Sequence, residues 1–87
     1  MYPIKPYHLE QARRLGVTIK PSTKKNYKLD VYKDGEYVTS IGDSRYKDYI
    51  IYREERGEAY ADERRRLYKL RHKKEGIRGR LASAILW

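Results

Sequence analysis

The sequence predicts an α+β fold, in which one short helix precedes a small antiparallel sheet and two further helices follow it. The strongest local signal is a hairpin, because Asp34-Gly35 lies between two β-prone runs, residues 27–32 and 36–41. Helical patterns of apolar and charged residues flank these runs on both sides. The 87 residues contain no Cys. We therefore expect a single domain, residues 1–87, with one small core and no disulfides.

The first helix is predicted over residues 6–15. Pro6 suits a first helical turn, and Gly16 suits the position just after the last one. Basic residues late in this segment complement the helix dipole. Apolar residues at three-residue spacing predict one narrow buried stripe, formed by Leu9, Ala12 and Leu15.

The sheet needs more than the hairpin, because two strands alone are marginally stable. Residues 17–20 alternate apolar and polar side chains and are the candidate third strand. The hairpin register is open, since a two-residue turn pairs Val31 with Val38, whereas a bulged turn pairs Val31 with Tyr37. In either register the side chains alternate between two faces, one formed by Leu29 and Val31 and the other by Lys28 and Asp30.

The two later helices are predicted over residues 48–56 and 58–75. Asp48 suits the N-cap of the first, and Gly57 suits its end. The second has its acids early and its bases late, in line with the helix dipole. One face of the second is expected to hold Tyr60, Glu63, Leu67, Leu70 and Lys74, with Ala61, Arg64 and Tyr68 beside it.

The last part of the chain divides by composition. A glycine-flanked basic loop is predicted over residues 76–80, so that residues 64–80 form a basic helix and loop. Residues 81–87 are an apolar segment. We expect this segment to dock onto the body as a short helix, because an exposed tail of that composition would aggregate.

Positive charge is concentrated towards the end of the sequence. The formal net charge of +9 consists of +4 over residues 1–42, −3 over residues 43–63 and +8 over residues 64–87. Residues 64–80 hold nine Lys or Arg and one acid, Glu75. A local field of this sign attracts polyanions, of which nucleic acid is the usual one.

We predict that the basic helix and loop contact phosphates, helped by a weaker patch near the hairpin. The first group is Arg65, Arg66, Lys69, Arg71, Lys73, Lys74, Arg78 and Arg80, and the second is Lys24, Lys25 and Lys28. Arg64 and Arg71 lie nearest the predicted apolar stripe, and for these two we expect pairing with acids of residues 43–63 ahead of phosphate contact. The sequence leaves open whether the two groups share a face.

Other chemistry has little support in the residues. The two histidines, His8 and His72, have no partners at metal-ligand spacing, and no phosphate loop, nucleophile motif or cofactor fingerprint is present. We therefore expect a non-enzymatic protein with no catalytic residues, metal or cofactor. Most of the ten tyrosines are expected to serve the small core, with base stacking as their alternative use.

Neither a membrane nor the secretory route is expected. No apolar run approaches the roughly 20 residues that span a bilayer, so we predict no membrane partner. Residues 1–6 lack the apolar middle of a secretory signal. We predict a protein that is not secreted.

Several short segments between His8 and Trp87 carry a resemblance. They are residues 21–23, 30–35, 40–42, 46–49, 60–62, 64–68, 71–74 and 85–87. In these segments the sequence resembles a family of small basic proteins encoded by large nucleocytoplasmic DNA viruses. One departure is Ile50, where the family pattern has Pro, and this bears on where the second helix starts. The resemblance implies a viral protein packaged in the virion, and it brings no known activity.

Together these features predict a non-enzymatic protein that binds the phosphate backbone of double-stranded DNA, for compaction or packaging of a viral genome. Its expected location is the virion or the host nucleus or cytoplasm, and RNA is an alternative partner. In a variant of this hypothesis the sheet enters a major groove with Tyr32, Tyr37 and Lys28 on its outer face. The alternative function is a structural virion protein, a minor capsid or scaffold component. Its basic helix would bind an acidic protein or a second copy of the chain.

Overall fold

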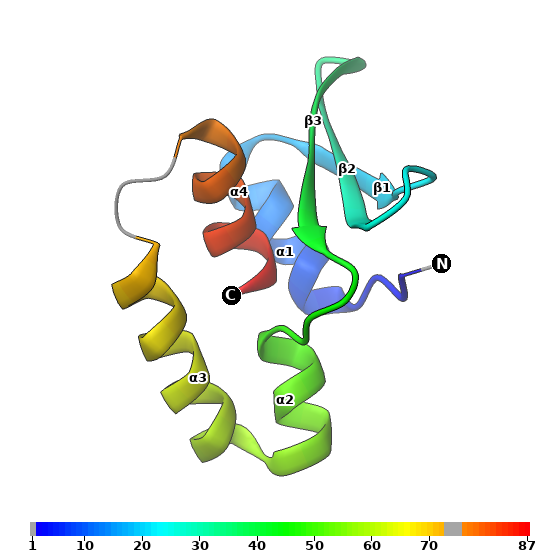
Figure 1. Cartoon of the computed structure of the whole chain (residues 1–87). Helices are drawn as coiled ribbons and strands as arrows, with labels where there is room; N and C mark the ends of the chain where they lie inside the picture. The colour runs from blue at the N-terminus through cyan, green and yellow to red at the C-terminus, as the bar shows by residue number, and fades with distance from the viewer. Residues whose placement is uncertain (1, 73–75) are drawn as a thin grey trace.

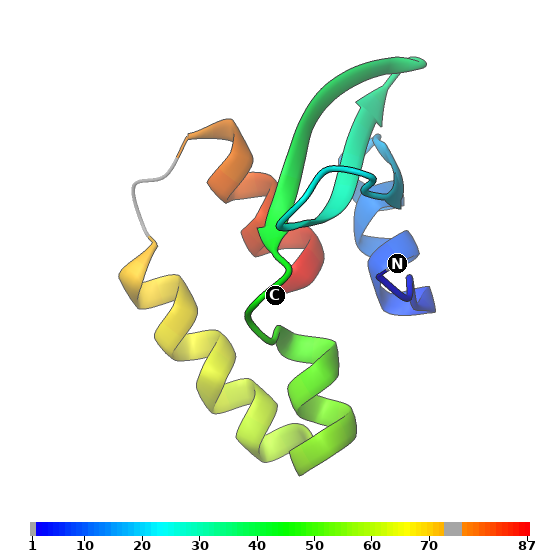
Figure 2. The ribbon, with the colours of Figure 1, turned by 45° about the vertical axis from the view of Figure 1, so that its right-hand side comes forward.

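The computed structural model describes residues 2–72 and 76–87, which form four helices and a three-stranded sheet (Figure 1). The elements are α1 (Pro6–Leu15), β1 (Thr18–Pro21), β2 (Tyr27–Lys33), β3 (Glu36–Asp43), α2 (Tyr49–Arg56), α3 (Glu58–Arg71) and α4 (Ile77–Leu86). α1 and α4 lie against the sheet, whereas α2 and α3 form a helical hairpin beside it (Figures 1 and 2). The predicted α+β class and the predicted order of elements are confirmed.

The sheet is antiparallel in the order β1-β2-β3, so the predicted third strand is confirmed as β1. The hairpin turn is Asp34-Gly35, with positive φ at both residues, as a type I′ turn requires. Beyond this turn the ladder shifts register, and Val31 pairs with Thr39. Both predicted pairings of Val31 are wrong, because the bulge lies in the strands and leaves Val38 exposed.

The main core lies between one face of the sheet and the helices α1 and α4. Leu29, Val31 and Ile41 fill the sheet side and are fully buried. α4 contributes Ile85 and Leu86 to the same cluster. The predicted docking of residues 81–87 onto the body is therefore confirmed.

α4 begins earlier than the sequence indicated. It starts at Ile77, so Arg78 and Arg80 lie in its first turn and the predicted mobile loop over these residues is wrong. Gly79 is buried in this helix. No helix in the described parts of the chain, α4 included, is both long and apolar enough to cross a membrane.

α1 has the predicted bounds but a different buried face. It ends at Gly16, which has a left-handed φ of 73°. His8 and Ala12 are buried, whereas Leu9 and Leu15 are 54% and 42% exposed. The predicted stripe is wrong at both leucines, because polar contacts of His8 within the body turn that face of the helix inward.

α2 and α3 form a second, smaller packing unit. Asp48 caps α2 as predicted, since its Oδ1 accepts a hydrogen bond from the N–H of Ile51 (3.3 Å). Gly57 ends α2, and α3 begins at the next residue. Trp87 packs against this unit and against the main core, so it joins the two. The buried residues of the second cluster are Tyr49, Ile50 and Ala61.

α3 differs from its predicted outline in two respects. It ends at Arg71, and the predicted continuation reaches residues 73–75, outside the described part of the chain. Ala61 is its buried residue, whereas Tyr60 and Leu70 are 38% and 49% exposed. The predicted apolar face is therefore wrong, because the helix turns Ala61 towards α2.

Candidate functional site

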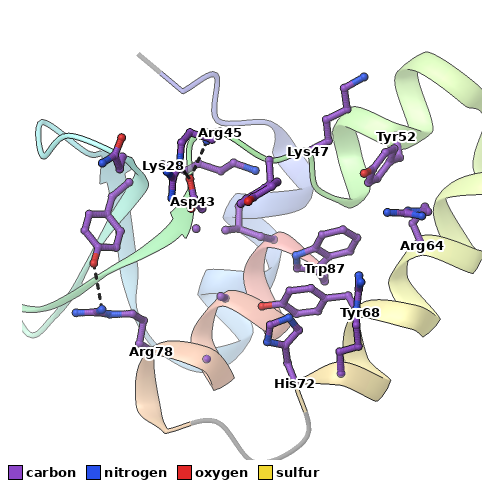
Figure 3. A pocket seen from close by; sticks show the side chains of 18 of the residues that line it. Lys28, Asp43, Arg45, Lys47, Tyr52, Arg64, Tyr68, His72, Arg78 and Trp87 are labelled. Carbon is purple, nitrogen blue, oxygen red and sulfur yellow. Dashed lines mark hydrogen bonds and ion pairs between the residues drawn. The ribbon is translucent and has the colours of Figure 1, made fainter.

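A cleft of about 850 Å³ opens between the end of the sheet and the helices α2, α3 and α4 (Figure 3). Segments that are far apart in the sequence build its walls. One wall comes from residues 25–28 and 42–47, which flank the sheet, and the facing walls come from the three helices. We call this hollow the cationic cleft.

The lining of the cationic cleft is strongly basic. Among the residues that the structure describes, Asp43 is the one acid in the lining, against seven Lys or Arg: Lys25, Lys28, Arg45, Lys47, Arg64, Arg71 and Arg78. Lys25 belongs to the weaker predicted patch, and Arg71 and Arg78 belong to the main one. The fold therefore brings members of both predicted groups to one cleft, a convergence that the sequence left open.

Three of these cations are neutralised within the protein. Lys28 pairs with buried Asp48 (2.8 Å), Arg45 with Asp43 (2.8 Å) and Lys47 with Glu55 (2.6 Å). Hydrogen bonds from Arg45 lower the pKa of Asp43 to about 2, so that carboxylate is charged in neutral solution. Within the described residues, no ion pair neutralises the other four: Lys25, Arg64, Arg71 and Arg78.

Arg64 is the most unusual of these four cations. Its Nε is buried and makes no hydrogen bond with any residue that the structure describes. Its guanidinium lies over the ring of Tyr52, 5.2 Å from the ring centre. The predicted pairings of Arg64 and Arg71 with acids are absent from the described residues. A buried donor without a partner costs free energy, which is recovered if the Arg64 side chain turns to meet an acceptor.

Arg78 is held in place without an acid. Its Nε donates to Thr39 Oγ1 (3.3 Å) and its Nη1 donates to the Tyr27 hydroxyl (3.1 Å). A guanidinium has five N–H donors, so most of them remain for a ligand. This fixed orientation limits the entropy that Arg78 would lose on binding an anion.

Aromatic rings lie between the basic walls (Figure 3). Trp87 stacks on Tyr68, with 4.5 Å between ring centres and planes 9° apart, and His72 stacks on Tyr68 at 4.3 Å. Tyr52 approaches Trp87 from α2 at 6.1 Å. Sequence reasoning assigned most tyrosines to the core and missed this group, although Tyr68 and His72 share a face of the basic helix at four-residue spacing.

Two residues of the predicted contact set use their charged groups in interactions within the protein. Lys28 is 4% exposed and pairs with Asp48. Arg65 donates from Nε to the backbone oxygen of Trp87 (2.6 Å), and its guanidinium lies 3.7 Å from the centre of the Tyr49 ring. We remove both from the proposed contacts, because either would have to break these interactions to reach a phosphate.

The other predicted cations that the structure describes lie at the surface outside the cleft. Arg66 pairs with Glu63 (2.5 Å), and Lys69 lies 3.5 Å from the backbone oxygen of Ser83. Arg80 is exposed. Lys24 donates to the Tyr37 hydroxyl (2.7 Å), a bond that raises the pKa of Lys24 and lowers that of Tyr37. Lys73 and Lys74 lie outside the described residues.

The outer face of the sheet fits the groove-reading variant in part. Tyr32 and Tyr37 lie together there, 5.8 Å apart. Lys20 and Lys24 lie over these rings at 5.1 and 4.3 Å. Lys28 does not belong to this exposed set, since its ammonium is buried.

A second polar cluster, which we call the buried network, lies beneath the N-terminal segment. The Asp48 carboxylate accepts hydrogen bonds from the Tyr2 hydroxyl and the Lys28 ammonium. His8 Nδ1 accepts from the N–H of Lys5 (3.0 Å), and its Nε2 lies 3.3 Å from the Tyr2 hydroxyl. Burial lowers the pKa of His8, although Asp48 opposes this, and burial with Asp48 raises the pKa of Tyr2.

Comparisons with known proteins add no assignment to this geometry. A scan against protein-family models, a search of curated proteins and a search of solved structures each gave no match. The chemistry of the cationic cleft is therefore the main guide to function.

Proposed function

We propose that this protein is a non-enzymatic nucleic-acid-binding protein that contacts phosphates through the cationic cleft and the basic residues around it. The observation that supports this most is the convergence of seven Lys or Arg on one cleft, with a single acid among the described residues of its lining. Four of these cations have no acidic partner among the described residues, and such a site favours a polyanion.

The proposal moves the centre of binding away from the outer face of α3. Two of the three consecutive arginines on that helix, Arg64 and Arg65, lie on its inward side, and Arg66 is paired with Glu63. Lys25, Arg71 and Arg78 remain from the predicted set, and the outer cations Lys69 and Arg80 extend it. Packaging of a viral genome stays part of the proposal through the resemblance alone.

The test is a titration of a labelled nucleic acid at several salt concentrations. We expect log affinity to fall linearly with log salt, because each phosphate contact releases counterions. The double variant Lys25→Gln/Arg71→Gln is expected to flatten this slope by about 2, since each lost phosphate contact contributes about 1.

A matched control is Arg14→Gln/Lys33→Gln, which removes the same charge from exposed sites outside the cleft. We expect its slope to stay close to that of the unmodified protein. Equal effects of the two double variants would show that net charge alone governs binding. No binding near physiological salt would contradict the proposal and favour the alternative of a structural virion protein that binds an acidic protein surface.

A further inference from the structure

The cationic cleft has a shape and a lining that restrict which part of a nucleic acid can occupy it. Its volume of about 850 Å³ lies in the range of sites that hold small molecules. Such a space accommodates one or two nucleotides, and it is too small to enclose a duplex. A duplex can meet the rim cations, but its bases are stacked on one another and cannot reach the interior.

The interior offers aromatic faces and edges as well as charge. Tyr27, Tyr46, Tyr52, Tyr68 and Trp87 all line the cleft. Trp87 and Tyr68 lie between Arg78 on one side and Arg64 with Tyr52 on the other (Figure 3). Rings for stacking together with cations for the backbone are the composition of sites that bind single-stranded nucleic acid.

Arg64 supplies a further indication of a polar ligand. Its Nε is buried at the cleft wall and has no hydrogen-bond partner among the described residues, while its guanidinium lies over Tyr52. Arginine planes and aromatic rings both stack on exposed bases, and guanidinium donors bind phosphate oxygens. An unpaired nucleotide presents both kinds of group at once.

Resting on the proposed function, we propose that the cationic cleft holds an unpaired nucleotide of a single strand. One base lies against Trp87 and Tyr52, and the next base of the strand stacks on Tyr46 of the facing wall. The adjoining phosphates meet Arg64, Arg78 and Lys25. A strand fits better than a free mononucleotide, because the lining cations exceed what one phosphate can neutralise and Arg80 and Lys69 continue the basic surface outside.

Trp87 makes the inference directly measurable, since it is the one tryptophan of the chain and it lines the cleft. The probes are a ten-nucleotide oligothymidine strand, an abasic strand of the same length, a ten-base-pair duplex, a ten-nucleotide oligouridine strand and free thymidine monophosphate. Stacking of a base near Trp87 is expected to change its fluorescence. We expect this change with oligothymidine or oligouridine, and affinity at least tenfold weaker for the abasic strand.

Oligothymidine and oligouridine distinguish DNA from RNA as the source of the nucleotide, and a response to either supports the inference. A duplex or abasic strand that binds as tightly as oligothymidine, with Trp87 fluorescence unchanged throughout, would overturn it and leave phosphate binding intact. Thymidine monophosphate binding as tightly as the strand would also overturn it, in favour of a free-nucleotide site. No binding of any strand would instead contradict the proposed function.

Variants of two tyrosines separate base contact from folding. Trp87 joins the two packing clusters, so its replacement endangers the fold. Tyr46 lines the cleft and is 69% exposed, which makes Tyr46→Leu structurally safe. We expect Tyr46→Leu to weaken oligothymidine binding about five- to tenfold with an unchanged salt slope. The control Tyr37→Leu, at a 45% exposed position on β3 outside the cleft, is expected to bind normally, and equal loss in both variants would contradict the inference.

Discussion

Lys25 and Lys28 lie three positions apart in the chain, yet one ammonium is paired with an acid and the other has no acidic partner among the described residues. Lys28 lines the cleft, but its ammonium belongs to the buried network, where Asp48, Tyr2 and His8 are joined to it by charge and hydrogen bonds. Lys25 belongs to the cationic cleft, where four cations have no acidic partner among the described residues. Both regions combine basic and aromatic side chains, but only the buried network is internally complete.

The difference indicates what each region is for. A charge removed from water must be paired, so we interpret the buried network as a set of interactions that maintain the fold. Cations that gather around a hollow without acidic partners repel one another. This difference supports our proposal that the cationic cleft binds an anion. Substitutions in the two regions should consequently have opposite effects on stability and binding.

The largest expected effect comes from Asp48→Asn in the buried network. The amide keeps the shape but leaves the Lys28 ammonium buried without a counter-charge. We expect a loss of about 3–5 kcal/mol in the free energy of unfolding, measured by urea denaturation followed by circular dichroism.

Two further variants sharpen that experiment. Asp43→Asn breaks the exposed pair with Arg45 and is expected to cost far less, because water screens that pair. Lys28→Met combined with Asp48→Asn removes both charges and should regain much of the lost stability. If Asp48→Asn were as stable as Asp43→Asn, the Lys28 ammonium would have to be hydrated in the variant. The buried network would then not be needed for stability.

Gly42 lies where the two regions meet, and it gives the second prediction. A Cβ there would lie 2.5 Å from Leu86 Cδ1 and 3.0 Å from Lys28 Cδ, and the backbone has a φ of +77°. We expect Gly42→Ala to cost about 2–4 kcal/mol of unfolding free energy, from crowding and backbone strain together. Urea denaturation provides the measurement.

Gly35→Ala is the matched control, because Gly35 also has positive φ but has open space around it. The difference between the two variants isolates the crowding. Equal losses would mean that Leu86 moves aside without cost, and the contact between the strand end and α4 would be looser than the packing indicates.

Local features of this chain could be predicted from its sequence. The turn at Asp34-Gly35, the cap at Asp48 and the stop at Gly57 depend on residues close by, and all three are present. The hairpin register was missed because a bulge near Val38 is set by how the strands meet the core. The position of β1 was found, since alternation alone indicates a strand.

Features that depend on distant partners could not be predicted. His8 turns α1 inward because it meets Tyr2, which in turn bonds Asp48, 40 positions further along the chain than His8. Arg65 and Arg66 are neighbours, yet only Arg65 reaches the backbone of Trp87. The residues of the cationic cleft come from segments that only the folded chain brings together, so composition indicated a basic protein without locating its site.

The third prediction is a pH dependence carried by His8. Its pKa is lowered below the ordinary 6.5, chiefly by burial, and the neighbouring Lys28 and Lys5 add to this while Asp48 and Glu54 oppose it. The unfolded chain then binds a proton more readily than the folded one as the pH falls below about 6.5. The free energy of unfolding therefore keeps its full value above that pH and falls below it, because of His8, by at most about 1.4 kcal/mol per pH unit.

His8→Gln is expected to reduce this slope between about pH 7 and pH 5 relative to the unmodified protein. His72→Gln is the control, because it removes the other histidine, which lies in the cleft. Unfolding free energies measured at each pH decide the matter. If His72→Gln reduced the slope and His8→Gln did not, the pH dependence of stability would arise in the cationic cleft. The buried network would then not be its source.

The smallest expected effect on stability is that of Lys25→Gln/Arg71→Gln. Both side chains are exposed and have no ion pair among the described residues, so their removal relieves repulsion and breaks no ion pair that the structure describes. We expect the urea midpoint to stay unchanged or rise slightly while nucleic-acid affinity falls. Arg14→Gln/Lys33→Gln is expected to change neither quantity much. A loss of stability approaching that of Asp48→Asn would mean that these two cations stabilise the fold. That result would contradict the proposal, because an anion-binding site should tolerate the loss of its charges.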